Sequence, residues 1–249
     1  MGTPRIALLE VDPELGRHLP AEDLEQARTA LTVTACDVAP GTLQLARLAP
    51  EAINPFAAYV VSGLLTRDID IGGQPALELL GPGDVLVGKE LQGTLPVRTR
   101  LVVSAQTRIA LLDDRLLAGV RHWPRLLPGL MQRVCAQRDQ LALQLAISHQ
   151  PRVEDRLMNL FWHLSDRFGS VTPEGICLPV SLTHEALGRL IGARRPTVTL
   201  ALRALDARGA LRRREDRSWL VAEWPPERKL DDAGLGPRAR PVPVAVEST

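Results

Sequence analysis

The chain has few of the residues that mark metal, redox or membrane proteins. Its three cysteines, Cys36, Cys135 and Cys177, are too far apart for the spacing of a zinc or iron–sulfur site. No apolar run approaches the length of a membrane-spanning helix, and the N-terminal segment lacks the apolar core of a secretory signal. We therefore expect a cytoplasmic protein without a disulfide framework, with no metal and no cofactor, and without a membrane partner.

Aromatic residues are also few, and the net charge is small. Aromatic residues make up 3% of the chain, so Leu, Val, Ala and Ile must supply the hydrophobic cores. The formal net charge is +1, which gives no overall positive field to attract nucleic acid. Affinity for DNA must therefore come from a local cluster of cations, and one such cluster lies between Arg189 and Arg217. The length of 249 residues suits two modest domains.

The first half of the chain has the texture of a β-rich domain. After a helical segment at 20–30, Gly and Pro divide it into short β-prone runs at intervals of about ten residues, as in sandwiches and jelly rolls. Gly72-Gly73 and Gly81-Pro82-Gly83-Asp84 are the sharpest turn signals. The predicted strands are 31–38, 41–48, 57–62, 64–71, 75–80, 84–88, 98–104 and 107–112.

Helical texture follows from Asp113 to His149 and includes one wide apolar stripe. The stripe can pack against the protein's own barrel or against a second copy of itself, and we favour a second copy. Gln137 or Arg138 interrupts the seam. The residues predicted at the dimer seam are Leu127, Met131, Val134, Leu141 and Leu145. Gln150-Pro151-Arg152 then forms a hinge before an amphipathic helix at 153–168.

The segment from Ser181 to Leu211 carries the clearest functional pattern. It contains two short apolar periodicities on either side of Gly192, with Thr183 placed to cap the first helix. The second helix begins at Arg194-Arg195-Pro196-Thr197 and should end at Gly209, where a left-handed residue costs least. Two helices joined by a tight turn form a helix-turn-helix, whose second helix lies in the DNA major groove. An ordinary helical hairpin would not need arginines and hydroxyls at that start.

A small basic hairpin should follow these helices. Residues 211–214 and 217–221 are separated by a turn at Glu215-Asp216. A winged helix has this shape, with cations of the wing facing phosphates. A solvated charge run is the alternative for the four arginines. After Pro225 the chain is rich in Pro, Gly and charge, so we expect 225–249 to be a disordered tail.

The order of barrel, long helix and winged helix resembles the cyclic-AMP receptor protein (Crp/Fnr) family from about Leu24 to Trp224. Family members carry a pattern of Thr, Leu-Gly, Ile-Gly and Arg-x-Thr-Val at fixed spacing, which this chain retains from Leu182 to Val198. The resemblance implies an α+β fold of four regions: a cyclic-nucleotide-binding-like β jelly-roll sensory domain (1–112), a dimerisation helix region (113–149), a winged helix-turn-helix (150–224) and the tail (225–249).

The resemblance also implies roles for individual residues. Arg195 lies where the family places its guanine-reading arginine, and a bidentate contact to guanine suits that role. Pro196 departs from the family pattern, since a glutamate stands there in the best-known members and proline can offer only an apolar contact. Leu200 lies where some members carry a second base-reading arginine. The predicted DNA-binding residues are Thr183, His184, Arg194, Arg195, Pro196, Thr197, Thr199, Arg212, Arg213, Arg214 and Arg217.

The sensory half departs from the nucleotide-binding pattern of that family. Arg98-Thr99 falls at the arginine–hydroxyl position, but Gly88 occupies the place of the ribose-binding glutamate and Glu90 is two residues away. The nucleobase-contacting residues of the long helix correspond to the stretch around Leu141. The candidate effector pocket is therefore Gly88, Arg98, Thr99 and Leu141, and we expect that cyclic AMP does not control the protein.

The predicted function is a homodimeric transcription regulator that binds pseudo-palindromic double-stranded DNA. A jelly-roll enzyme and an interaction adaptor that no longer binds DNA are the alternatives. An enzyme is disfavoured because the predicted strands contain no histidine and no recognisable carboxylate pair. RNA polymerase is a further candidate partner. No sequence motif identifies a small-molecule effector. The sequence does not distinguish an activator from a repressor.

Overall fold

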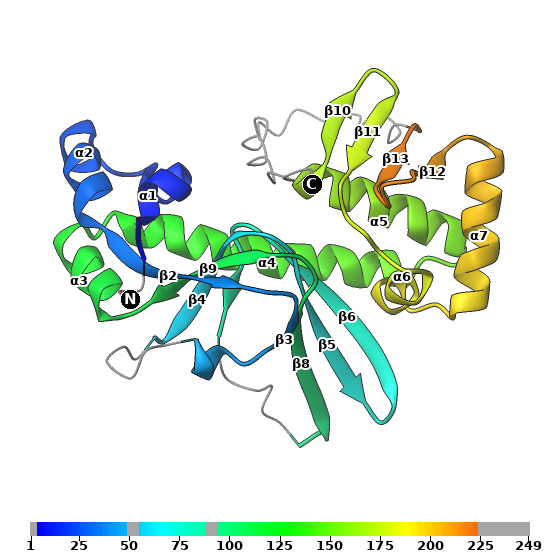
Figure 1. Ribbon diagram of the computed structural model, residues 1–249, viewed down its shortest axis with the longest axis horizontal. Helices are drawn as coiled ribbons and strands as arrows, with labels where there is room; N and C mark the ends of the chain where they lie inside the picture. The colour runs from blue at the N-terminus through cyan, green and yellow to red at the C-terminus, as the bar shows by residue number, and fades with distance from the viewer. Residues whose placement is uncertain (1–3, 49–54, 88–93, 224–249) are drawn as a thin grey trace. The chain divides into compact units, whose positions relative to one another are not determined.

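The computed structural model describes residues 4–48, 55–87 and 94–223 (Figure 1). The chain divides into two compact units, residues 1–141 and 142–249. The division lies inside the long helix α4 (Leu126–Ser148), so each unit contains part of that helix. The predicted α+β fold is confirmed, because antiparallel strands dominate the N-terminal unit and helices dominate the C-terminal unit.

Two antiparallel sheets form the body of the N-terminal unit. One has the strand order β1-β2-β9-β4-β7 and the other β3-β8-β5-β6. Between them lies a core to which Val60 and Ile109 contribute from the first sheet and Leu65 and Val103 from the second. No strand pair in the described part of the chain joins the two sheets, so they form an open roll. The strands are β1 (Arg5–Ala7), β2 (Thr32–Val38), β3 (Gly41–Leu43), β4 (Ala57–Ser62), β5 (Leu65–Ile71), β6 (Gln74–Leu80), β7 (Val85–Leu86), β8 (Val97–Val103) and β9 (Thr107–Leu112).

Most predicted strands coincide with these elements, and two differ. The run predicted as a strand at 41–48 is extended only as far as Leu43 and then forms the 3₁₀ turn η2 (Leu45–Arg47). The turn lets Leu45 and Leu48 both pack against the core between the sheets, which an alternating strand would not allow. The strand predicted at 84–88 is limited to β7, and Gly88 lies outside the described residues.

Helices cover the outer face of the first sheet. They enclose a second core that includes Leu8, Val33, Tyr59 and Leu126. The short N-terminal elements β1, α1 and η1 were not predicted, since three or four residues are too few to show a periodicity. These helical elements are α1 (Leu8–Val11), η1 (Pro13–Gly16), α2 (Ala21–Ala30) and α3 (Asp114–His122).

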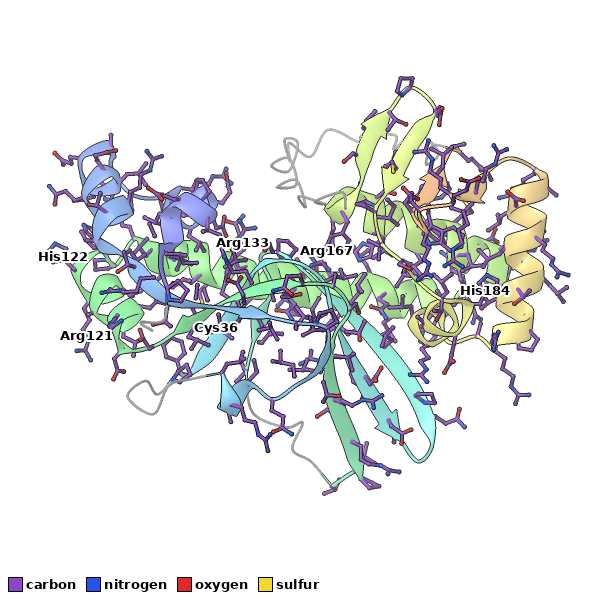
Figure 2. The ribbon with its side chains drawn as sticks, in the orientation of Figure 1. Cys36, Arg121, His122, Arg133, Arg167 and His184 are labelled. Atoms are coloured by element: carbon purple, nitrogen blue, oxygen red, sulfur yellow. The ribbon has the colours of Figure 1, made fainter. Side chains whose placement is uncertain are left out.

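A buried ionic cluster joins the N-terminal segment to α4. Asp12 is 6% exposed and accepts hydrogen bonds from the Tyr59 hydroxyl and from two nitrogens of Arg133, which is labelled in Figure 2. Burial and the adjacent Asp12 carboxylate raise the pKa of Tyr59 far above its ordinary value, so the phenol keeps its proton to donate. The cluster thus fixes one face of α4 in the N-terminal unit.

The C-terminal unit is built on α5 (Val153–Phe168), which coincides with the predicted amphipathic helix. Its buried residues Leu157 and Phe161 share a core with Leu187, Val198 and Leu205. The hairpin β10–β11 was not predicted, although its turn contains Pro173 and is followed directly by Gly175. The remaining elements are β10 (Ser170–Thr172), β11 (Gly175–Leu178), α6 (His184–Ile191), α7 (Arg195–Ala207), β12 (Leu211–Arg213) and β13 (Trp219–Val221). The sheet has the order β10-β11-β13-β12.

We expect Arg133→Met to lower the free energy of unfolding of the N-terminal unit by about 3 kcal/mol, because it leaves the buried Asp12 carboxylate without its cation. Urea denaturation followed by circular dichroism measures this loss. Arg17→Met is the matched control, since Arg17 belongs to the same unit, with a side chain 61% exposed that pairs with Glu14. The control should change stability by less than about 0.5 kcal/mol. Equal losses in the two variants would contradict the role of the cluster.

Candidate nucleic-acid interface

The predicted helix-turn-helix is formed by α6 and α7. The Thr183 hydroxyl caps α6 by accepting a hydrogen bond of 3.1 Å from the backbone N–H of Ala186. Gly192 ends α6 in the left-handed conformation at φ 66°, which an L residue adopts only with strain. Arg194 is the N-cap residue of α7, and Pro196 lies in the first turn, where its missing N–H leaves no bond unmade. The local structure predicted for this segment is confirmed.

The turn between the helices is tight because Gly188 has no side chain. A Cβ atom at Gly188 would lie 2.5 Å from the carbonyl oxygen of Ala193, which is closer than real contacts allow. The N–H of Ala193 donates to the Gly188 carbonyl at 2.8 Å and closes the turn. Beyond the turn, Val198 is fully buried and aligns α7 against the core. The buried Val198 therefore sets the rotation of α7 about its axis, so that the polar residues of its first turn face outward.

The outward face at the start of α7 carries four of the eleven predicted contact residues. Arg194, Arg195, Pro196 and Thr197 are all exposed at the start of the helix. Leu200 is 65% exposed one turn later, where an apolar side chain can contact a thymine methyl group. The prediction omitted an exposed arginine on the same face, Arg203. Its position seven residues after Pro196 is the helical spacing that could have indicated it.

Thr199 and His184 are both partly buried and contact each other. Nδ1 of His184 lies 2.9 Å from Oγ1 of Thr199, and that hydroxyl lies 3.0 Å from the carbonyl oxygen of Arg195. Partial burial lowers the pKa of His184, and the charges of Arg213, Arg195 and Arg203 lower it further. Thr199 therefore supports His184, which is labelled in Figure 2.

A hollow of about 350 Å³ opens beside this pair. It is lined by Thr183, His184, Glu185, Arg195 and Arg213. Three helix or strand elements thus contribute to it: α6, α7 and β12. With two arginines and a histidine in its wall, the hollow suits an anion such as a phosphate.

The basic hairpin is the predicted wing. Its strands β12 and β13 pair in antiparallel register, Arg213 opposite Trp219, and the guanidinium of Arg213 lies 5.5 Å from the Trp219 ring centroid. At the tip Asp216 accepts hydrogen bonds from the backbone N–H and the hydroxyl of Ser218, and these bonds lower the pKa of Asp216. Arg217 takes a left-handed conformation at φ 67°, so the turn projects its side chain under mild strain.

The cations of this surface differ in how they are paired. Arg214 forms an ion pair of 3.0 Å with Glu174, and Arg212 lies 3.9 Å from Asp206. Exposed pairs of this kind contribute little and exchange readily for a phosphate. The other arginines of the surface form no ion pair with any residue that the structure describes: Arg194, Arg195, Arg203, Arg213 and Arg217. Uncompensated charge therefore gathers on α7 and the wing.

Comparison with known proteins agrees with this geometry. Residues 155–224 match the sequence model of the Crp-like helix-turn-helix domain. The C-terminal unit contains a Crp-like helix-turn-helix domain. The predicted resemblance to the Crp/Fnr family is thereby confirmed at the segment that suggested it. No curated protein sequence matches the chain.

Solved structures extend the likeness to both units. A cyclic nucleotide-binding domain containing protein from Listeria monocytogenes EGD-e is 14% identical, with a TM-score of 0.62 over 86% of this chain and 98% of that chain. A CRP-family transcriptional regulator from Thermus thermophilus is 17% identical, with a TM-score of 0.56 over 76% and 92%. The c-di-GMP responsive global regulator CLP from Xanthomonas campestris is 19% identical, with a TM-score of 0.54 over 82% and 100%. At these identities the likenesses show the fold.

Two residues of the candidate effector pocket, Arg98 and Thr99, lie on opposite faces of β8. Arg98 is exposed opposite Asp70, while the next residue, Thr99, is opposite Ile69 on the other face of the sheet. Leu141 is 39% exposed on α4, and Gly88 lies outside the described residues.

A polar group that the prediction missed lies on the inward side of the roll. There the buried Glu78 pairs with Arg67 and contacts Gln137 of α4. Glu78 and Gln137 are separated by 59 positions along the chain, so no sequence spacing indicates the contact.

The residues predicted at the dimer seam form an exposed apolar stripe along α4. The exposed fractions are 51% for Leu127, 54% for Met131, 49% for Val134, 39% for Leu141 and 60% for Leu145. By contrast, Leu126 and Ile147 on the other face are buried at 1% and 7%. Arg138 interrupts the stripe, as the sequence indicates.

The described residues contain no group of three His, Cys, Asp or Glu side chains that could hold a metal ion. Cys36, Cys135 and Cys177 are free thiols, and burial raises the pKa of the Cys36 thiol. Among the described helices, none is both long enough and apolar enough to cross a membrane.

We expect Thr183→Ala to lower the stability of the C-terminal unit by about 1 kcal/mol, since it removes the hydroxyl that caps α6 of the Crp-like domain. Thermal and urea unfolding measure this loss. Thr183→Ser keeps the cap and should lose less than about 0.5 kcal/mol. Ser181→Ala, at an exposed residue before the helix, is the control. A loss in the control as large as in Thr183→Ala would contradict the capping role.

Proposed function

We propose that this protein is a homodimeric, sequence-specific DNA-binding transcription regulator of the Crp/Fnr type. The observation that carries the proposal is the outward first turn of α7 beside a basic wing. Arg194, Arg195 and Thr197 project from this turn, and Arg213 and Arg217 from the wing. The Crp-like match of residues 155–224 supports the same function.

The roles of the contact residues follow from their positions. Arg195 is exposed at the first position of α7, where a bidentate contact to guanine O6 and N7 is the commonest specific contact in a major groove. Pro196 and Leu200 offer apolar surface to thymine methyl groups. The wing arginines contact phosphates and hold the protein on the DNA, but they do not read individual bases.

A dimer follows from the stripe on α4. Five apolar side chains, each at least 39% exposed, lie at the spacing with which two helices pack along a common seam. A two-fold axis through this seam would present two copies of α7 to half-sites about one helical turn of DNA apart. The operator is therefore expected to be pseudo-palindromic.

Control by cyclic AMP is not expected. The outward position of Arg98 separates it from Thr99, and glycine stands at the position of the ribose-binding glutamate. A neighbour in structure is named as responsive to c-di-GMP, so related folds serve other signals. We therefore propose a regulator whose signal, where one acts, is not cyclic AMP.

We expect the protein to enrich a two-fold symmetric motif from random duplex DNA, equally with and without cyclic AMP or cyclic GMP. Arg195→Ala should remove the preference for individual base pairs while the dimer stays folded, because the guanine contact is lost and the phosphate contacts remain. Sequencing of the bound duplexes measures this preference.

Arg208→Ala is the control for that experiment, because Arg208 lies at the other end of α7 and pairs with Glu154 and Glu223. It should keep the motif. An unchanged motif in Arg195→Ala would contradict its base-reading role. Enrichment that requires a cyclic nucleotide would contradict the proposed independence from that signal.

We expect the double variant Leu141→Asp with Leu145→Asp to be monomeric and to bind the enriched duplex much more weakly, because charge in the seam opposes its burial. Analytical ultracentrifugation gives the mass and fluorescence anisotropy the affinity. Leu117→Asp is the matched control, since Leu117 on α3 is 41% exposed and lies outside the stripe. A double variant that sediments as a dimer would place the interface elsewhere.

A further inference from the structure

The hydrogen bonds of Thr199 determine which nitrogen of His184 carries a proton. The Thr199 hydroxyl has one hydrogen, and the Arg195 carbonyl oxygen 3.0 Å away can only accept it. When the hydroxyl donates to that carbonyl, its 2.9 Å contact with His184 is a hydrogen bond in the tautomer whose Nδ1–H donates, and we assign that tautomer. In the neutral ring the other nitrogen, Nε2, is therefore unprotonated.

With Nδ1 directed to Thr199, Nε2 is the nitrogen that remains for the hollow. The charged groups that face His184 come from each neighbouring element: Arg195 and Arg203 from α7, and Arg213 from β12. On α6 itself, the Glu185 carboxylate is paired with Arg189. Positive charge therefore predominates around the hollow, and the His184 ring lies in its wall.

A phosphate in the hollow would reverse the electrostatics at the ring. Without DNA, burial and the three arginines hold the pKa of His184 below its ordinary value, which favours the uncharged ring. A phosphodiester beside Arg195 and Arg213 places a negative charge within reach of Nε2. An anion at that distance favours the protonated imidazolium.

We propose that His184 takes up one proton when the helix-turn-helix binds DNA, so that Nε2–H donates a hydrogen bond to a backbone phosphate in the hollow. The proton comes from water or buffer, and Nδ1–H keeps its bond to Thr199 throughout. The inference rests on the proposed function, since it names a contact of the same DNA-binding surface. It makes hydrogen ion concentration a determinant of operator affinity.

The sign of the pH dependence follows from the two states. The pKa of His184 is lower in the free protein than in the complex, so the contact contributes fully below the free pKa and is lost as pH rises through the bound pKa. Each unit of difference changes affinity about tenfold per histidine, and about a hundredfold for the two histidines of a dimer.

Calorimetry of the dimer with the enriched duplex, in buffers of different ionisation enthalpy, tests the proposal. Between the two pKa values we expect close to two protons taken up per dimer, and tighter binding as the pH falls. His184→Gln places a neutral donor near Nε2 and should lose the uptake. His184→Arg carries a permanent charge and should bind with little dependence on pH. His149→Gln, at an exposed histidine of the same unit, should keep the uptake of the unchanged protein.

Proton uptake that persists in His184→Gln would overturn the proposal, as would binding by the unchanged protein with no uptake at any pH. Nuclear magnetic resonance titration of the His184 ring provides a readout without substitutions, and its pKa must rise on addition of the duplex. An unchanged or lower pKa would overturn the proposal and leave the proposed function intact. Failure of both the unchanged protein and His184→Arg to bind any duplex would instead overturn the proposed function itself.

Discussion

The close approach of the Ala193 carbonyl to Gly188 is the constraint on which the candidate DNA-binding surface depends. A side chain at Gly188 would push the turn away from α6, and Val198 would then leave the core that it shares with Leu187. Because α7 is held by Val198 and Leu205 on its inner side, the residues at its start have one available direction. The charge of this surface is thus positioned by apolar packing and not by the ion pairs around it, which are exposed and weak.

The long helix α4 meets a different constraint on each of its faces. Arg133 and Gln137 attach one face to the roll through Asp12, Val85 and Glu78, and the adjacent face carries the unburied stripe. A helix held in this way cannot rotate to bury its apolar residues against its own unit without breaking the buried Asp12 contact. The polar anchors on one face therefore keep the apolar stripe on the adjacent face exposed.

Sequence reasoning located the elements whose pattern is local. The strands at 57–62 and 107–112 coincide with the structure because each is a short, largely apolar run between turn signals, and both are buried on two faces. The helix at 153–168 coincides because helical periodicity runs its full length. The cap at Thr183 and the left-handed Gly192 were likewise predictable from their neighbours. Contacts between distant residues were not, because no spacing rule connects Asp12 to Tyr59 or His184 to Thr199.

Pro196 has a consequence for the energetics of recognition. Its ring fixes φ near the helical value, so the first turn of α7 has fewer conformations available when the chain is unfolded or frayed. A segment that is already ordered loses little conformational entropy when it enters a groove. The same ring removes one of the free N–H groups with which a helix start attracts anions. In the proposed complex the helix start is therefore rigid and relies on side chains more than on backbone amides. We expect single substitutions there to alter the preferred DNA sequence while the helix stays intact.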